Sequence, residues 1–119
     1  SDVCSSDLMQ SGQSANFQHM LDVKSRHVAH ILQQVQERGI TTLEPTAQAE
    51  QDWVDTIVKL AIGRRAFLSE CTPGYYNNEG GTLDMRVAKN NQYWRGPVVY
   101  IRQLDRWRAD GTMPGLELA

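Results

Sequence analysis

The strongest constraint on the fold is a helical spacing of apolar residues in the first third of the chain. Between Asn16 and Arg38 these residues recur every three or four positions, as one face of an α-helix requires. They are Met20, Val28, Ile31, Leu32 and Val35. Asn16 is a residue type that caps helix N-termini, and Gly39 can take the positive φ of a C-terminal cap. The pattern predicts a helix over residues 16–38 with one apolar stripe to bury.

The same periodicity predicts two further helices, over residues 46–70 and 97–110. Thr46 is suited to cap the first of them, because its hydroxyl oxygen can accept an unpaired N–H group of the first turn. Gly63 can end or bend this helix, since glycine has a low helix propensity. Pro97 fits the first turn of the second helix, where its missing N–H costs nothing. We therefore expect a mainly α fold.

Short extended segments and one long loop connect these helices. Residues 40–44 are rich in β-branched side chains and precede Pro45, so a strand or an extended linker is expected there. Residues 116–118 are expected to form a second short strand. Residues 72–96 mix glycine, asparagine and aromatic residues without a period, which predicts a long loop. Loops of this length are usually functional or disordered, and the aromatic side chains argue against disorder.

Charge and residue composition exclude several classes of partner. Twelve Lys and Arg residues accompany fourteen Asp and Glu residues, without a block of like charge, so no nucleic-acid partner is expected. No apolar run approaches the roughly 18 residues of a membrane span, so no membrane partner is expected. Cys4 and Cys71 are far apart, which favours a reducing, cytoplasmic location. His27 and His30 lie three residues apart, but no third ligand completes a metal site beside them.

The first eight residues need a separate explanation. Their order, Ser-Asp-Val-Cys-Ser-Ser-Asp-Leu, matches the translation of a common sequencing adapter. We expect that residues 1–8 are not native sequence and that Cys4 carries no function. Residues 9–119 are then expected to be the C-terminal piece of a larger protein.

Four stretches of the chain form an ordered set of motifs. They are SGQSANFQHMLD with HVAHIL, LEPTAQAEQDW, CTPGYYNNEG, and GPVVYIRQLDRWRADG with GLEL. Together they resemble the C-terminal part of the Baeyer–Villiger flavoprotein monooxygenases, the family of the cyclohexanone and cyclopentadecanone monooxygenases. Two positions depart from the family's pattern: Gln48 stands where glutamate is frequent, and Tyr75 stands where tryptophan is usual.

The resemblance implies a fold and an activity for an intact parent protein. The fold would be an incomplete C-terminal piece of an α/β flavoprotein with two dinucleotide-binding domains, for FAD and NADP. The activity would be the insertion of one oxygen atom of O2 into a ketone, with NADPH as reductant, to give an ester or a lactone. The piece alone is expected to be inactive and to pack against the missing N-terminal domains. It contains no GxGxxG motif with which to bind a dinucleotide by itself.

The resemblance also implies secondary roles for two short segments, and no catalytic residue. The first segment is a loop that closes the flavin end of the site through backbone groups, with cofactor contacts at Gly12, Gln13, Ser14 and Asn16. The second is a mobile lid near the nicotinamide cofactor and the substrate, formed by Tyr75, Tyr76, Asn77 and Asn78. A lid of this kind excludes water from the reaction. The tyrosines could equally serve only to pack the loop.

Two other functions remain open from the sequence. A related NADPH-dependent flavoprotein could oxidise nitrogen or sulfur atoms instead of ketones, and only upstream sequence would separate these two activities. A free-standing helical module could instead use its apolar faces to bind a partner protein.

Overall fold

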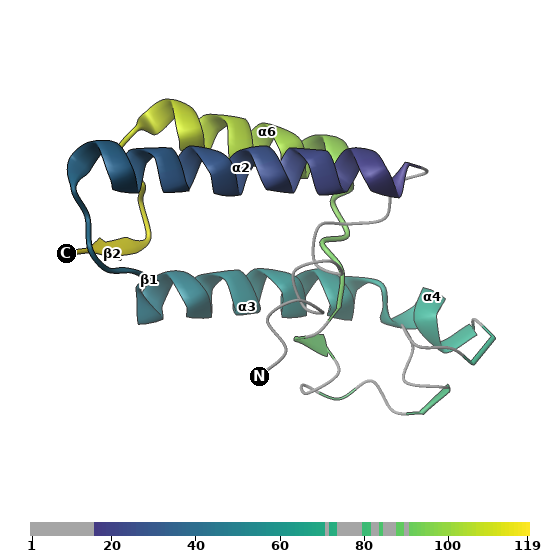
Figure 1. Ribbon diagram of the computed structural model, residues 1–119. Coiled ribbons are helices and arrows are strands. Elements are labelled where there is room, and N and C mark those ends of the chain that lie inside the picture. The colour runs from purple at the N-terminus through teal and green to yellow at the C-terminus, as the bar shows by residue number, and fades with distance from the viewer. Residues whose placement is uncertain (1–15, 71, 74–79, 82–83, 85–87, 90) are drawn as a thin grey trace.

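The computed structural model describes residues 16–70, 72–73, 80–81, 84, 88–89 and 91–119, and the described part is mainly helical with a two-stranded sheet (Figure 1). Its elements in chain order are α2 (Phe17–Arg38), β1 (Leu43–Pro45), α3 (Ala47–Gly63), α4 (Arg65–Glu70), α6 (Pro97–Asp110) and β2 (Leu116–Leu118). None of the helices in these residues is both long enough and apolar enough to cross a membrane.

Side-chain and glycine caps fix the ends of the first long helices. The Asn16 side chain accepts a hydrogen bond from the His19 backbone N–H at 3.1 Å, which satisfies one unpaired donor at the start of α2. Gly39 ends α2 with a φ of 64°, the left-handed conformation that glycine adopts without steric cost. Thr46 caps α3 in the same way as Asn16, by accepting from the Ala49 N–H at 3.1 Å.

The helical segment predicted over residues 46–70 is divided at Arg64, directly after Gly63, where an end or a bend was expected. The Arg64 N–H bonds back to the carbonyl oxygen of Ala61 at 3.0 Å, three residues earlier, and this tightens the last turn of α3. Gly63 precedes the break and weakens the helix there, because glycine loses more backbone conformational entropy on folding than other residues do. The separate helix α4 then begins at Arg65.

The extended segment predicted over residues 40–44 forms a strand only from Leu43, and the strand includes Pro45. It pairs antiparallel with β2, with Leu43 opposite Leu118 and Pro45 opposite Leu116. Beyond the ladder, the N–H groups of Thr41 and Thr42 donate to the carbonyl oxygen of Ala119 at 2.6 and 2.9 Å. The short sheet therefore joins the connection between α2 and α3 to the C-terminal residues.

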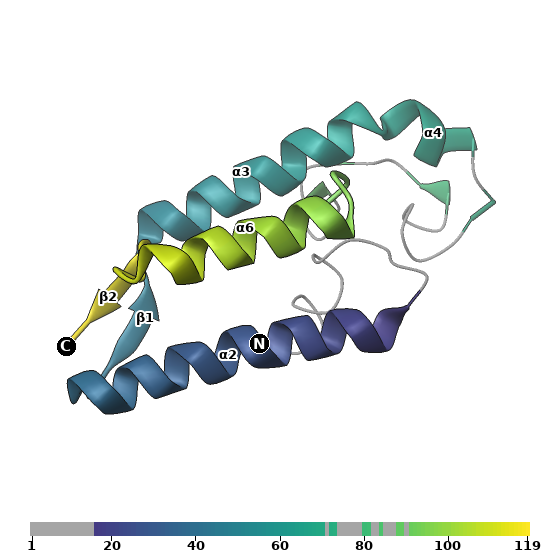
Figure 2. The same cartoon turned by 90° about the horizontal axis from the view of Figure 1, so that it is seen from above.

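The axes of the long helices are roughly aligned, and α3 runs in the opposite direction to α2 and α6. In the view from above, α2 lies beside α6 and α3 lies on the other side of α6 (Figure 2). The buried core formed by the described residues is small. Its hydrophobic members among the described residues are Met20, Val23, Ile57, Val58, Ala61, Ala88, Tyr93 and Met113. Several large hydrophobic side chains remain exposed instead, and half of them lie on α2.

Gly115 holds the C-terminal strand close to the start of α3. Its φ is +85°, and its carbonyl oxygen accepts from the Thr46 N–H at 2.8 Å. A Cβ at this position would lie 2.9 Å from the Cβ of Ala49, closer than two side-chain carbons approach. No side chain can therefore be added here without moving the strand or the helix.

Replacing Gly115 by alanine is expected to lower the free energy of unfolding by about 2–3 kcal/mol, because backbone strain and a steric clash add together. Gly39→Ala is the matched control. Its φ is +64° but no atom lies within 4 Å of the added Cβ, so it should cost only about 1 kcal/mol. Urea unfolding of both variants measures the difference, and equal losses would show that the contact with Ala49 is unimportant.

Candidate functional site

The residues predicted to contact the cofactor fall mostly outside the described part of the chain. Gly12, Gln13 and Ser14 lie outside it, and Asn16 lies at its first position. The Asn16 side-chain oxygen accepts the hydrogen bond that caps α2.

The residues predicted to form a lid, Tyr75, Tyr76, Asn77 and Asn78, also lie outside the described residues. The structure does describe the C-terminal end of the same long segment, at residues 91–96. Its first three residues are buried, with exposed fractions of 3%, 2% and 4% for Asn91, Gln92 and Tyr93. A segment expected to be a loop is thus firmly fixed at this end.

Three aromatic rings from different parts of the chain meet at this end, and we call Trp53, Tyr93 and Tyr100 the aromatic anchor. The Trp53 ring on α3 stacks on the Tyr93 ring, with ring centroids 5.5 Å apart and planes 15° apart. Tyr100 on α6 lies against both, at 6.3 Å from Trp53 and 5.8 Å from Tyr93. Aromatic pairs at these distances stabilise each other beyond the area that they bury. The aromatic anchor therefore ties the end of the predicted lid segment to two helices.

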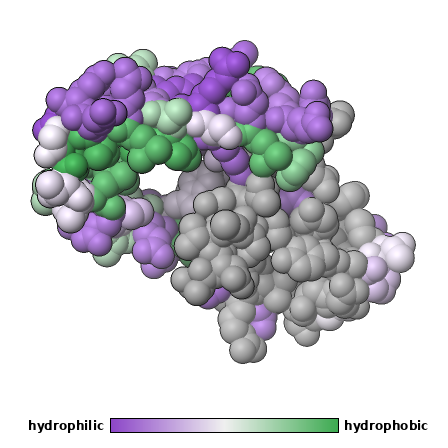
Figure 3. Space-filling model, in the orientation of Figure 1, coloured by the Kyte–Doolittle hydropathy of each residue, from purple (hydrophilic) through white to green (hydrophobic). Residues whose placement is uncertain are grey.

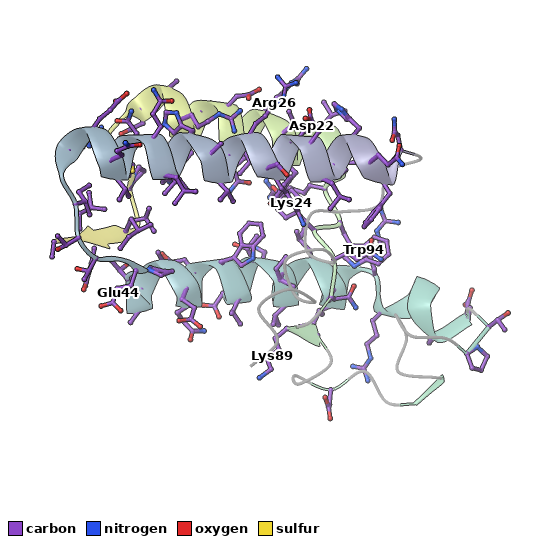
Figure 4. The ribbon with its side chains drawn as sticks, in the orientation of Figure 1. Asp22, Lys24, Arg26, Glu44, Lys89 and Trp94 are labelled. Atoms are coloured by element: carbon purple, nitrogen blue, oxygen red, sulfur yellow. The ribbon has the colours of Figure 1, made fainter. Side chains whose placement is uncertain are left out.

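Polar contacts reinforce the aromatic anchor. The Asn91 side-chain oxygen accepts from the Trp94 indole N–H at 2.7 Å and from the Gln92 backbone N–H at 2.9 Å. Trp94 lies near the C-terminal end of α3 (Figure 4), and the Arg64 guanidinium lies 5.4 Å from the centre of its ring. A guanidinium at this distance over an indole is attracted to the ring face. The turn before α6 is therefore held by hydrogen bonds among its own residues and by the contact between Trp94 and Arg64.

Gln92 differs from its neighbours because its buried amide is unsatisfied. Neither its side-chain oxygen nor its side-chain nitrogen has a hydrogen-bond partner, although the residue is only 2% exposed. Leaving a buried polar group unpaired costs about 1–3 kcal/mol. Sequence patterns gave no signal for this burial, because a glutamine within a polar loop is ordinarily exposed. Among the described residues, Gln92 is the buried side chain with two polar atoms that lack a hydrogen-bond partner.

Replacing Gln92 by methionine, which has a similar shape, is expected to raise the free energy of unfolding by about 1–2 kcal/mol. The substitution removes two unsatisfied polar atoms and keeps the core filled. Gln103→Met on the exposed side of α6 is the control and should change stability by less than about 0.5 kcal/mol. A loss of stability in Gln92→Met alone would mean that the amide has a partner in solution.

A second cluster joins α2 to α6. The His27 ring meets the Trp107 ring edge to face, with centroids 4.9 Å apart. The His27 Nδ1 lies 3.3 Å from an Arg108 guanidinium nitrogen, and Arg108 also pairs with Asp105. Because a guanidinium can only donate, His27 Nδ1 accepts in this contact and the ring is neutral. Burial lowers the pKa of His27, and the charges of Arg108 and His30 lower it further.

This lowered pKa predicts a loss of stability in acid. The groups that face His27 are Arg108 and Asp105 from α6, with His30 on its own helix. Unfolding frees the ring to take up a proton at its ordinary pKa of about 6.5, so the unfolded state binds more protons below that pH. The free energy of unfolding is therefore expected to fall as the pH drops through about 6.5 and to level off below the folded pKa.

Stability measured between about pH 8 and pH 5 tests this expectation. His27→Gln keeps an acceptor for Arg108 but cannot be protonated, so its stability should fall less steeply than that of the wild type. His19→Gln on the exposed face of the same helix is the matched control and should keep the wild-type slope. Equal slopes in the wild type and His27→Gln would contradict the assignment.

Comparison with known proteins gives several relatives of this chain. The chain is 42% identical over 110 residues to pentalenolactone D synthase of Streptomyces arenae. It is 38% identical over 103 residues to a Baeyer–Villiger monooxygenase of Stachybotrys chlorohalonatus, and 34% identical over 108 residues to an FAD-binding monooxygenase of Hypomyces subiculosus. No family model and no solved structure matches the chain.

These matches cover nearly all of this chain but little of each relative. The match to the Streptomyces arenae protein covers 92% of this chain but 18% of that protein. The corresponding shares are 87% and 16% for the Stachybotrys protein, and 91% and 18% for the Hypomyces protein. The chain thus spans less than a fifth of the proteins that it resembles. Identity at this level along about nine-tenths of the sequence shows common descent, and the chain belongs to the family of the Baeyer–Villiger flavoprotein monooxygenases.

Proposed function

We propose that this chain is the C-terminal part of a Baeyer–Villiger monooxygenase that inserts one atom of O2 into a ketone to give an ester or a lactone. The observation that carries the proposal is its 38% identity to a Baeyer–Villiger monooxygenase of which it spans 16%. The order of its four motifs supports the C-terminal position. The chain alone is inactive in this proposal, and its substrates, a ketone and O2, bind to the whole protein.

FAD and NADP are the proposed cofactors of the whole protein. The name of the Hypomyces relative supports FAD, and the family resemblance alone supports NADP. Bound FAD supplies the oxygen chemistry, while the protein positions and shields it. We assign no catalytic residue to this chain. Gly12, Gln13, Ser14 and Asn16 are proposed to contact the cofactor through backbone groups, because the Asn16 side chain already caps α2.

The long segment between α4 and α6 is proposed to act as a lid. Tyr75, Tyr76, Asn77 and Asn78 would approach the nicotinamide cofactor and the substrate and exclude water from them. The aromatic anchor supports this proposal, because a lid must be fixed at one end if its other part is to close reproducibly. In the structure, stacking of Tyr93 on Trp53 supplies a fixed end.

The remaining proposals concern the surroundings of the chain. We propose that it packs against N-terminal domains of the same protein, that it acts in the cytoplasm, and that residues 1–8 are not native sequence. Oxidation of nitrogen or sulfur atoms is less well supported than ketone oxidation, because a relative at 38% identity carries the Baeyer–Villiger name.

A chimera tests the proposed function. In it, this chain replaces the segment of the Stachybotrys relative to which it aligns. We expect the purified chimera to be yellow with bound FAD and to oxidise NADPH only when a ketone substrate of that relative is present. The isolated 119-residue chain, the control, should bind no FAD. A chimera that holds FAD but oxidises only amines or sulfides would contradict the proposal.

A further inference from the structure

The helix α2 carries a row of exposed hydrophobic side chains. They are Phe17, Leu21, Val28 and Leu32, with exposed fractions of 56%, 36%, 53% and 60%. At 3.6 residues per turn, their spacing of four, seven and four residues places all four within about 60° of one another around the helix. We call this row the α2 stripe. Its four members are half of the large hydrophobic residues that are exposed in the described part of the chain.

The α2 stripe is not the side of α2 that packs within the chain. The buried side carries Met20 and Val23, which are 2% and 8% exposed, and His27, which contacts Trp107 of α6. The helical spacing places these residues about a third of a turn away from the stripe. Contact with α6 therefore leaves the stripe uncovered. Hydrophobic residues gather along the lower side of α2, at the edge of an opening in the surface (Figure 3).

Several polar side chains of α2 form pairs with one another and do not cover the stripe. Asp22 pairs with Arg26 at 2.9 Å, and Gln33 donates to Glu37 at 2.7 Å. These pairs occupy the opposite face of the helix from the stripe. The helix thus has a polar face suited to water and an apolar face suited to another protein surface.

The size of the stripe argues against a second copy of the chain as its cover. Four side chains on one helix are far fewer than the roughly 20–30 residues that each partner contributes to a stable interface between separate proteins. A surface in the same polypeptide needs less contact area, because a covalent link removes most of the entropy cost of association. The Streptomyces arenae relative offers such a surface, since this chain spans 18% of its length and leaves the other 82% outside.

We propose that the α2 stripe is the surface through which this segment packs against the remainder of its monooxygenase chain. The inference rests on the proposed function and adds to it which face of which helix forms the contact. The complementary surface must be apolar and free of unpaired charge, since burying a charge beside these residues would be costly.

The chimera tests the inference with the double substitution Val28→Lys and Leu32→Lys. We expect the yield of soluble, FAD-loaded chimera to fall about tenfold or more, because the new ammonium groups would be buried without partners. Val98→Lys is the matched control. Val98 is 59% exposed on α6 and outside the stripe, so its variant should keep the wild-type yield. In the isolated chain the double substitution should leave the free energy of unfolding unchanged, because both side chains already face water.

Each other outcome has a defined meaning. An unchanged yield of FAD-loaded double variant, or an equal loss in Val98→Lys, would overturn the inference and leave the proposed function intact. An isolated chain that is dimeric, and that the double substitution makes monomeric, would show that a second copy covers the stripe and would also overturn it. A chimera with native stripe residues that holds no FAD would count against the proposed function itself.

Discussion

Replacing Trp53 by alanine is expected to lower the free energy of unfolding of the chain by about 3 kcal/mol. The Trp53 ring stacks on Tyr93 and lies against Tyr100, so its loss leaves a cavity between α3, α6 and the end of the long loop. Urea unfolding followed by circular dichroism measures the change. The loss should be large for a partly exposed residue, because the Trp53 ring contacts rings from two other segments of the chain.

Two further variants separate ring stacking from simple filling of space. Trp53→Phe keeps a ring against Tyr93 and should recover about half of the loss. A double-mutant cycle between Trp53→Leu and Tyr93→Leu should give a coupling energy of about 0.5–1.5 kcal/mol. A coupling energy of zero would mean that the two rings do not stack in solution.

The chimera carrying Tyr93→Leu is expected to oxidise NADPH at the normal rate. A larger share of the O2 that it reduces should be released as hydrogen peroxide instead of entering the ester. Leucine fills most of the buried space but removes the ring stacking that fixes one end of the proposed lid. Stacking is worth up to about 1.5 kcal/mol, which corresponds to about a tenfold change in the ratio of closed to open lid. The ratio of peroxide to ester should therefore rise by up to about tenfold, because an open lid admits water.

Tyr93→Phe is the matched control, since it keeps the ring and loses only the hydroxyl group. It should show the wild-type ratio of peroxide to ester. If Tyr93→Leu also keeps that ratio while its stability falls, then the aromatic anchor stabilises the fold without controlling a lid. Peroxide and ester are measured in the same reaction, so a general loss of activity cannot be mistaken for a change in their ratio.

Periodicity and capping rules are enough to place the long helices, because both depend on residues close together in the sequence. Asn16 and Gly39 could be assigned to the ends of α2 from their residue types alone, and the structure has a side-chain cap at the first and a left-handed turn at the second. Glycine's low helix propensity predicted an end or a bend at Gly63, and the structure ends α3 there. The bond of three-residue spacing at Arg64 could not be predicted, because a helical pattern of apolar residues does not reveal it.

The contacts that could not be predicted join residues far apart in the sequence. Tyr93 is one of the aromatic residues of the predicted long loop, but its stacking partner Trp53 lies 40 residues earlier on another element. The pairing of Thr41 with Ala119 and the burial of Gln92 depend likewise on the path of the whole chain. The family resemblance supplied an activity for the parent but no described residue with a role in catalysis.

The central claim, that this chain belongs to a protein that inserts an oxygen atom of O2 into a ketone, is tested most directly by isotope labelling. The chimera is supplied with NADPH, its ketone substrate and O2 enriched in a heavy oxygen isotope, and the product is analysed by mass spectrometry. We predict an ester or a lactone that contains one labelled oxygen atom. An unlabelled product, or a labelled N-oxide or sulfoxide in place of the ester when amines and sulfides are offered beside the ketone, would contradict the account.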